Sequence, residues 1–192
     1  MKAVTTVALA LLPLLALAPS LAEPQQSTSS SARPRQESER LRQELVVLLA
    51  DVRSASDVLS ARSSYDDFMF RLDKIGKRLS SIRSKYQGPL NRGDHRALGV
   101  PIADACASLF ASASDWKQAR LAAGEVASAQ GTVARAASWE IDYYQAQLRT
   151  AQQRHAEAQK RLADRTGTTL ALVQAATKAQ EESKKQAVAA RK

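Results

Sequence analysis

Residues 41–86 read LRQELVVLLADVRSASDVLSARSSYDDFMFRLDKIGKRLSSIRSKY, and this stretch decides the fold class of the chain. Its apolar residues recur at alternating spacings of four and three, before and after a polar interruption at residues 60–66. Such spacing is typical of coiled-coil seams. The first seam comprises Leu41, Leu45, Leu48, Val52, Ala55 and Leu59, and the second comprises Phe68, Leu72, Ile75, Leu79, Ile82 and Tyr86.

The two seams match each other if the chain folds back at Ser63 and Ser64, which have turn and N-cap chemistry. In each of the six layers, from Leu59–Phe68 to Leu41–Tyr86, the two residue numbers then sum to 127. A single turn therefore satisfies every layer. The sequence predicts an antiparallel helical hairpin over residues 37–87.

The charges beside the seams agree with this register. In an antiparallel pair, it sets Glu44 against Lys85 and Asp51 against Arg78. Each exposed pair contributes only a few tenths of a kcal/mol. Together they favour this register over a shifted one.

A second heptad pattern runs from Ile102 to Leu162 and is rich in alanine. A straight helix drifts about 20° per heptad from such a pattern, so its persistence indicates supercoiling around a partner. We therefore expect one long helix over residues 101–165. The alternative is two helices broken near residues 124–131, where glycine is unfavourable in a helix interior. The seam positions are Ile102, Cys106, Leu109, Ala113, Trp116, Arg120, Ala123, Ala127, Gln130, Ala134, Ala137, Ile141, Tyr144, Leu148, Ala151, His155, Ala158 and Leu162.

The remaining segments complete an all-α chain that forms an elongated bundle or coiled coil. Residues 23–36 are expected to be a disordered linker, because they are rich in Ser, Gln and Pro. Residues 88–100 are expected to be a loop. Thr166-Gly167-Thr168 is expected to end the long helix. Residues 168–192 then form a C-terminal helix and a basic tail.

Residues 1–22 have the features of a signal peptide. Lys2 precedes an apolar run, and Ser20-Leu21-Ala22 places small residues at a cleavage site. We expect cleavage near Ala22 and export to the periplasm or the medium. The alternative is an uncleaved membrane anchor. No other stretch approaches the roughly 20 apolar residues that a second membrane span needs.

The chain is basic, with a net charge of +9. On an exported protein, this balance points to an anionic membrane or cell-wall polymer rather than to nucleic acid. Basic residues concentrate between residues 74 and 96, and we expect Lys74 and Lys77 to point outward without partners. A solvated basic face is the alternative. The candidate surface for an anionic partner comprises Lys74, Lys77, Arg83, Arg92 and Arg96.

The sequence contains no catalytic motif, and we expect no cofactor, no metal and no enzymatic activity. Neither His95 nor His155 has a second ligand at helical spacing. Cys106, the single cysteine, lies on a seam, which predicts an inert buried thiol, with an intermolecular disulfide as the alternative. Trp139 and Tyr143 fall off the seam, as Tyr65 does, and could leave an aromatic surface for a second contact.

These observations favour a non-catalytic scaffold, adaptor or chaperone-like binder of the cell envelope, with a protein partner or self-association through helix faces. Residues 143–163 are similar in composition to the helical hairpins of secretion adaptor proteins. The alternative is a binder of anionic envelope polymer or membrane surface through the basic patch. An enzyme of unrecognised type is the third class.

Cleavage after Ala22 predicts a mature protein that begins at Glu23. Intact-mass analysis of protein recovered from the envelope or the medium measures this directly. A mass that retains residues 1–22 would instead indicate a membrane-anchored protein.

Overall fold

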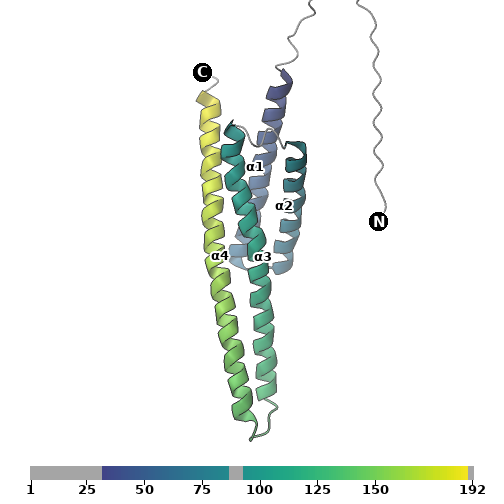
Figure 1. The fold of residues 1–192 in the computed structure, drawn as a ribbon, viewed down its shortest axis with the longest axis vertical. Coiled ribbons are helices and arrows are strands. Elements are labelled where there is room, and N and C mark those ends of the chain that lie inside the picture. Colours follow the sequence, from purple (N-terminus) through teal and green to yellow (C-terminus); the bar gives the residue numbers. More distant parts are fainter. Residues whose placement is uncertain (1–31, 87–92, 190–192) are drawn as a thin grey trace, which may run out of the picture.

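The computed structural model describes residues 32–86 and 93–189, which form four α-helices. They are α1 (Ala32–Ala61), α2 (Tyr65–Lys85), α3 (Gly93–Val133) and α4 (Ile141–Ala189). Successive helices run antiparallel, and α1 and α2 pack against one half of the longer α3–α4 pair (Figure 1). The other half of α3–α4 projects beyond the α1–α2 turn (Figure 1). The start of α1 and the end of α4 lie at the opposite end of the molecule from the α3–α4 turn. The expected all-α, elongated bundle is confirmed.

The α1–α2 turn has the local chemistry that the sequence predicted. The Ser64 side chain caps α2 by accepting a hydrogen bond from the Asp67 main-chain N–H at 3.2 Å. Arg62 ends α1 with a φ of 47°, the left-handed conformation common one residue past a helix end. The Ser63 N–H then reaches the Val58 carbonyl at 3.4 Å and satisfies one of the free carbonyls at the end of α1.

The register of this hairpin is confirmed by its ion pairs. Arg78 lies 2.9 Å from Asp51, and Lys85 lies 3.6 Å from Glu44, as the heptad assignment requires. All six α1 seam residues are buried, as are four of the six on α2. Leu79 and Tyr86 are the exceptions and are partly buried.

The core extends beyond the hairpin because α1 and α2 also pack against α3 and α4. Leu49, which lies beside the α1 seam, is fully buried. On the α2 side, the Trp116 ring of α3 lies 5.3 Å from the Phe68 ring and 5.6 Å from the Tyr65 ring, between centroids. Arg120 covers Tyr65 at 4.7 Å. The first two helices therefore form one core with the second pair.

The single long helix over residues 101–165 is wrong, because the chain turns between α3 and α4 at residues 134–140. The break also lies after the alternative position at residues 124–131. The connection is seven residues long, which is one heptad. The seam of α4 keeps the heptad phase of the first half of α3, from Ile102 to Trp116, as if no turn intervened. Heptad phase alone cannot distinguish such a connection from a continuous helix.

The expected seam is also wrong in the second half of α3. Arg120 and the seam residues that follow it on α3 are exposed. The residues that face inward there lie one position earlier, beginning with Ala119 and Ala122. They continue a second α3 face that starts at Ala105 and Ser108, and this face packs along α4. α3 thus has one seam for α1 and α2 and another for α4.

Two expected helix starts are wrong. Residues 32–36, assigned to the linker, are the start of α1, and residues 93–100, assigned to a loop, are the start of α3. Pro101 therefore lies inside α3 rather than in its first turn. The early start of α3 buries Leu98 and places His95 at 2.7 Å from the Ser38 hydroxyl of α1. The leader, the rest of the linker and residues 87–92 lie outside the described residues.

At the C-terminal end, α4 continues without interruption through Thr166-Gly167-Thr168. The heptad seam of α4 explains this, because it runs on from Leu162 through the buried residues Thr169, Val173, Ala176 and Gln180. Thr166 and Thr168 donate hydrogen bonds to main-chain carbonyls four residues earlier. They are therefore accommodated in the helix rather than capping a new one.

By length and composition, α3 is apolar enough to cross a membrane, with a mean hydropathy of 1.4 in its most apolar window. The sequence had indicated no second stretch of this kind. The larger apolar residues Ile102, Leu109 and Trp116 are buried in the bundle core.

Replacing Gly167 with Ala should raise the free energy of unfolding by about 1 kcal/mol, because glycine is that much less favourable in a helix interior. Gly167 is exposed, and a Cβ there would meet no atom within 4 Å. Urea denaturation followed by circular dichroism measures the change. Gly124→Ala in α3 is the matched variant and should shift stability in the same direction, since Gly124 has equally open space. A loss of stability in Gly167→Ala alone would show that α4 is interrupted there.

Candidate functional site

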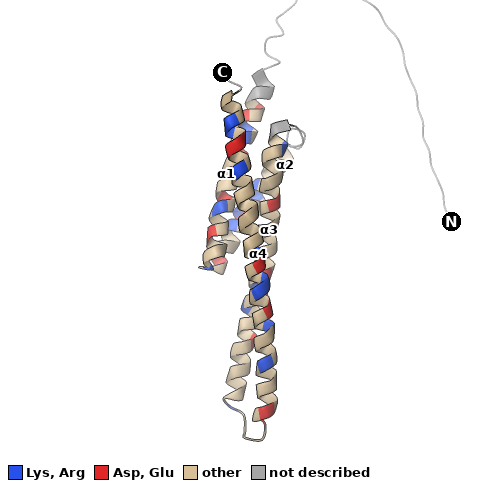
Figure 2. Cartoon of the chain, turned by 90° about the vertical axis from the view of Figure 1, so that its left-hand side faces the viewer, with Lys and Arg blue, Asp and Glu red and all other residues tan. Residues whose placement is uncertain are grey.

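The structure separates the basic residues that the sequence grouped together. Lys74 is bound to Asp51 of α1 at 2.8 Å, and Lys77 to Asp73 at 2.6 Å. Both were expected to be unpaired, and this is wrong. Asp51 can reach two cations of α2, and Asp73 lies four residues before Lys77 on the same helix. In the view of Figure 2, acidic residues are interspersed with basic ones along the helices.

Arg83 and Arg96 are brought together by the fold, although they belong to α2 and α3. Both are exposed, and with the side chains described for residues 36–86 and 95–189 neither forms an ion pair. They line one groove of about 820 Å³ between these helices. Arg92, the fifth member of the expected set, lies outside the described residues.

The groove has an apolar lining beneath these arginines. α1 contributes Leu45 and Leu48 to its floor, and Leu79 and Val100 line it from α2 and α3. Val100 has 48% of its surface exposed. Farther along the same helix interface, Phe110 packs on Gly76, where a Cβ would lie 3.5 Å from the ring. The two arginines belong to the predicted basic surface, but the apolar lining was not predicted, because it depends on how α2 and α3 are placed in space.

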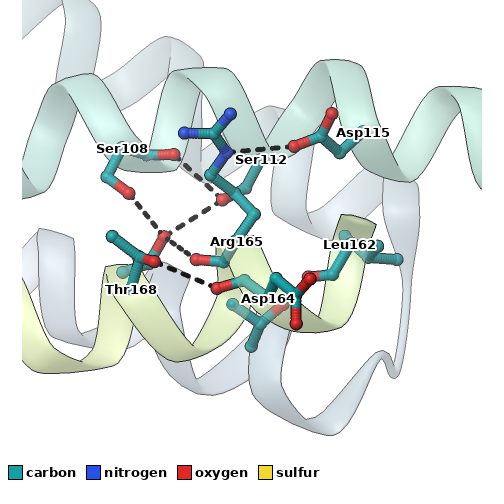
Figure 3. Close-up of polar contacts among 9 residues, drawn as sticks. Ser108, Ser112, Asp115, Leu162, Asp164, Arg165 and Thr168 are labelled. Atoms are coloured by element: carbon teal, nitrogen blue, oxygen red, sulfur yellow. Dashed lines mark hydrogen bonds and ion pairs between the residues drawn. The ribbon is translucent and has the colours of Figure 1, made fainter. Parts of the chain in front are cut away.

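A polar cluster lies between α3 and α4 and was also missed. The Ser108 hydroxyl lies 2.8 Å from the Thr169 hydroxyl, and the Ser112 hydroxyl lies 3.1 Å from it. Beside them, Arg165 of α4 reaches Asp115 of α3 at 3.0 Å (Figure 3). The hydroxyls of Ser112 and Thr169 also donate to main-chain carbonyls of their own helices. The Ser108 hydroxyl is therefore the one that donates to Thr169, and this hydrogen bond joins α3 to α4.

The histidines are engaged in hydrogen bonds. His155 lies 3.2 Å from the Gln159 side chain on α4, and His95 contacts Ser38. Among the described residues, no group of three or more His, Cys, Asp or Glu side chains could hold a metal ion.

The α3–α4 turn presents two of the three aromatic residues that fell off the predicted seams. Trp139 lies in the turn with 81% of its surface exposed, and Tyr143 in the first turn of α4 is 65% exposed. The Tyr143 and Tyr144 rings meet edge to face, 5.3 Å apart. Tyr65 instead packs on Trp116. The turn is shaped by Glu140, whose carboxylate accepts the Ala137 main-chain N–H at 3.3 Å.

Cys106 is fully buried on the seam of α3. Burial raises the pKa of its thiol to about 11, although the positive charge of Arg83 acts in the opposite direction. Reaction needs the thiolate and access to the sulfur, and the fold limits both.

We therefore expect Cys106 of the folded protein to react with a maleimide orders of magnitude more slowly than the same thiol in denaturant. Intact-mass analysis over time measures the rate. A control variant, Ser114→Cys/Cys106→Ala, carries an exposed thiol on the same helix and should react at once. Equal rates for the two proteins would show that α3 opens readily at Cys106 and would make the intermolecular disulfide feasible.

Two surfaces of the described chain are thus candidates for binding, the aromatic α3–α4 turn and the arginine-edged groove near the other end. No family model matches the chain, and no match was found among curated proteins or solved structures.

Proposed function

We propose that this protein is a non-catalytic adaptor of the cell envelope that binds a protein partner through the end of its α3–α4 hairpin. The observation that carries the proposal is the exposure of Trp139, 81%, at the extreme of a projecting helix pair. Burying an indole of this size upon association is strongly favourable. Trp and Tyr are also enriched among the residues that dominate binding energy at protein interfaces.

The construction of the hairpin supports this role. Arg62 of the α1–α2 turn donates to Gln159 of α4 at 2.8 Å, and Arg120 stacks on Tyr65. Beyond these contacts, α3 and α4 continue as a pair (Figure 1). The pair carries an ion pair between Glu125 and Arg154 at 3.9 Å. The aromatic turn is therefore held away from the bundle core on regular secondary structure.

A protein partner fits the charges of the turn better than an anionic membrane or polymer does. Arg135 is accompanied by Glu140 and Asp142, so the turn and the start of α4 carry charges of both signs. Such a surface has no net attraction for a polyanion. Export of the mature protein, proposed from its leader sequence, places this partner in the periplasm or outside the cell.

Binding of an anionic envelope component is the second candidate function. The observation that favours it is the pair Arg83 and Arg96, which the fold leaves without ion pairs among the described residues. The rest of the described basic set is neutralised by neighbouring acids. The surface proposed to bind an anionic component is therefore one groove rather than a broad basic face.

Site-specific photocrosslinking in the intact host tests the adaptor function. A benzophenone amino acid at position 139 should give a discrete adduct, and Tyr143→Ser should reduce its yield several-fold. Phe70 is the matched control position, because it is an aromatic residue on α2 with a similar exposure of 71%. The same amino acid at position 70 should give no such adduct.

The mass of the adduct identifies the partner class. An adduct of twice the chain mass would identify self-association through the turn, and a larger or smaller protein adduct would identify a distinct partner. Identical products from positions 139 and 70, or none from position 139, would contradict a binding role for the turn.

A further inference from the structure

We propose that the groove between α2 and α3 is a binding site for a fatty acid, with the carboxylate at Arg83 and Arg96 and the acyl chain along the apolar lining. The site lies near the end of the bundle opposite the aromatic turn, at residues 79–84 of α2 and 96–103 of α3. It does not depend on the adaptor function, because the two surfaces share no residue.

The groove leaves apolar surface open to water beside the core. Leu79 belongs to the predicted seam of the hairpin, yet it is only partly buried where α2 diverges from α3. Val100 faces it across the groove and is half exposed. An acyl chain would cover both side chains and remove their surface from water.

Two guanidinium groups lie at the same groove. Arg83 comes from the last turn of α2 and Arg96 from the first turn of α3. Within the described residues, neither is neutralised, whereas Lys74, Lys77, Arg78 and Lys85 all lie within 4 Å of an Asp or Glu oxygen. The guanidinium fork matches a carboxylate in geometry as well as in charge. The groove therefore joins an unneutralised cationic pair to an apolar strip.

The shape of the groove selects a single chain as the occupant. Its volume of about 820 Å³ is within the range of small-molecule sites. The floor residues Leu45 and Leu48 are already buried, so an occupant would find its open apolar surface at Leu79 and Val100. Phe110 on Gly76 fills the α2–α3 interface farther along and limits the length of the groove. One extended acyl chain suits these limits better than a two-chain lipid or a protein segment.

Isothermal titration with decanoate, below its micelle concentration, tests the proposal on the mature full chain. We expect one site per chain and binding at least tenfold weaker in Arg83→Gln/Arg96→Gln. The matched control is Lys74→Gln/Lys77→Gln, which removes the same charge from exposed side chains, and it should bind within about twofold of wild type. Raising the salt concentration should weaken wild-type binding, because exposed charges are screened.

Three further measurements separate this occupant from others. Ser80→Trp, which fills the groove without changing charge, should abolish decanoate binding, while the circular dichroism melt stays that of the wild type. Acetate and decyltrimethylammonium should each bind at least tenfold more weakly than decanoate, because one lacks the chain and the other has the wrong charge. Equal loss in the arginine and lysine variants would overturn the proposal, as would binding to anionic vesicles without binding to decanoate.

Discussion

The arrangement of the molecule depends on α3, which packs against two sets of neighbours at once. One face, from Ile102 to Trp116, carries large side chains and meets α1 and α2. The other face, from Ala105 to Val133, carries mainly Ala and Ser and runs along α4. Burial of apolar surface stabilises a fold by about 25 cal/mol per Å². Each small side chain buries little of it and so contributes little. The α3–α4 contact must therefore extend over many turns, and this accounts for the length of both helices.

The α1–α2 hairpin could be predicted from sequence because large residues mark every layer. Leu48 or Ile75 at the wrong position would leave an apolar side chain in water, so the pattern has a single solution. The charges of Asp51 and Glu44 point to the same register. The sequences of α3 and α4 say less about how these helices pack, because alanine is tolerated on either side of a helix. The α4 seam also keeps the heptad phase of the first half of α3, which concealed the turn at residues 134–140.

The two candidate sites also differ in how far they could be predicted from the sequence. The exposure of Trp139 and Tyr143 agrees with their positions off the seam, but Tyr65, which is also off the seam, packs on Trp116. Arg83 and Arg96 were grouped correctly from sequence, but the apolar lining between them could not be anticipated, since it depends on how α2 and α3 are placed in space. The pairing of Lys74 with Asp51 was missed because Asp51 had been assigned to Arg78 alone. A basic surface predicted from sequence is thus too large when each acidic residue is assigned to one cation, because an acid such as Asp51 can pair with two.

The common end of α1 and α4 has a consequence for how the molecule can be tethered. Ala32 and Ala189 lie far from the α3–α4 turn (Figure 1). The 49 residues of α4 correspond to a reach of about 74 Å at a rise of 1.5 Å per residue. A link to a membrane or another domain through either helix end would leave Trp139 at the far extremity of a stiff spacer. Neither attachment would obstruct the aromatic turn, and its partner would be met at a distance set by the length of α4.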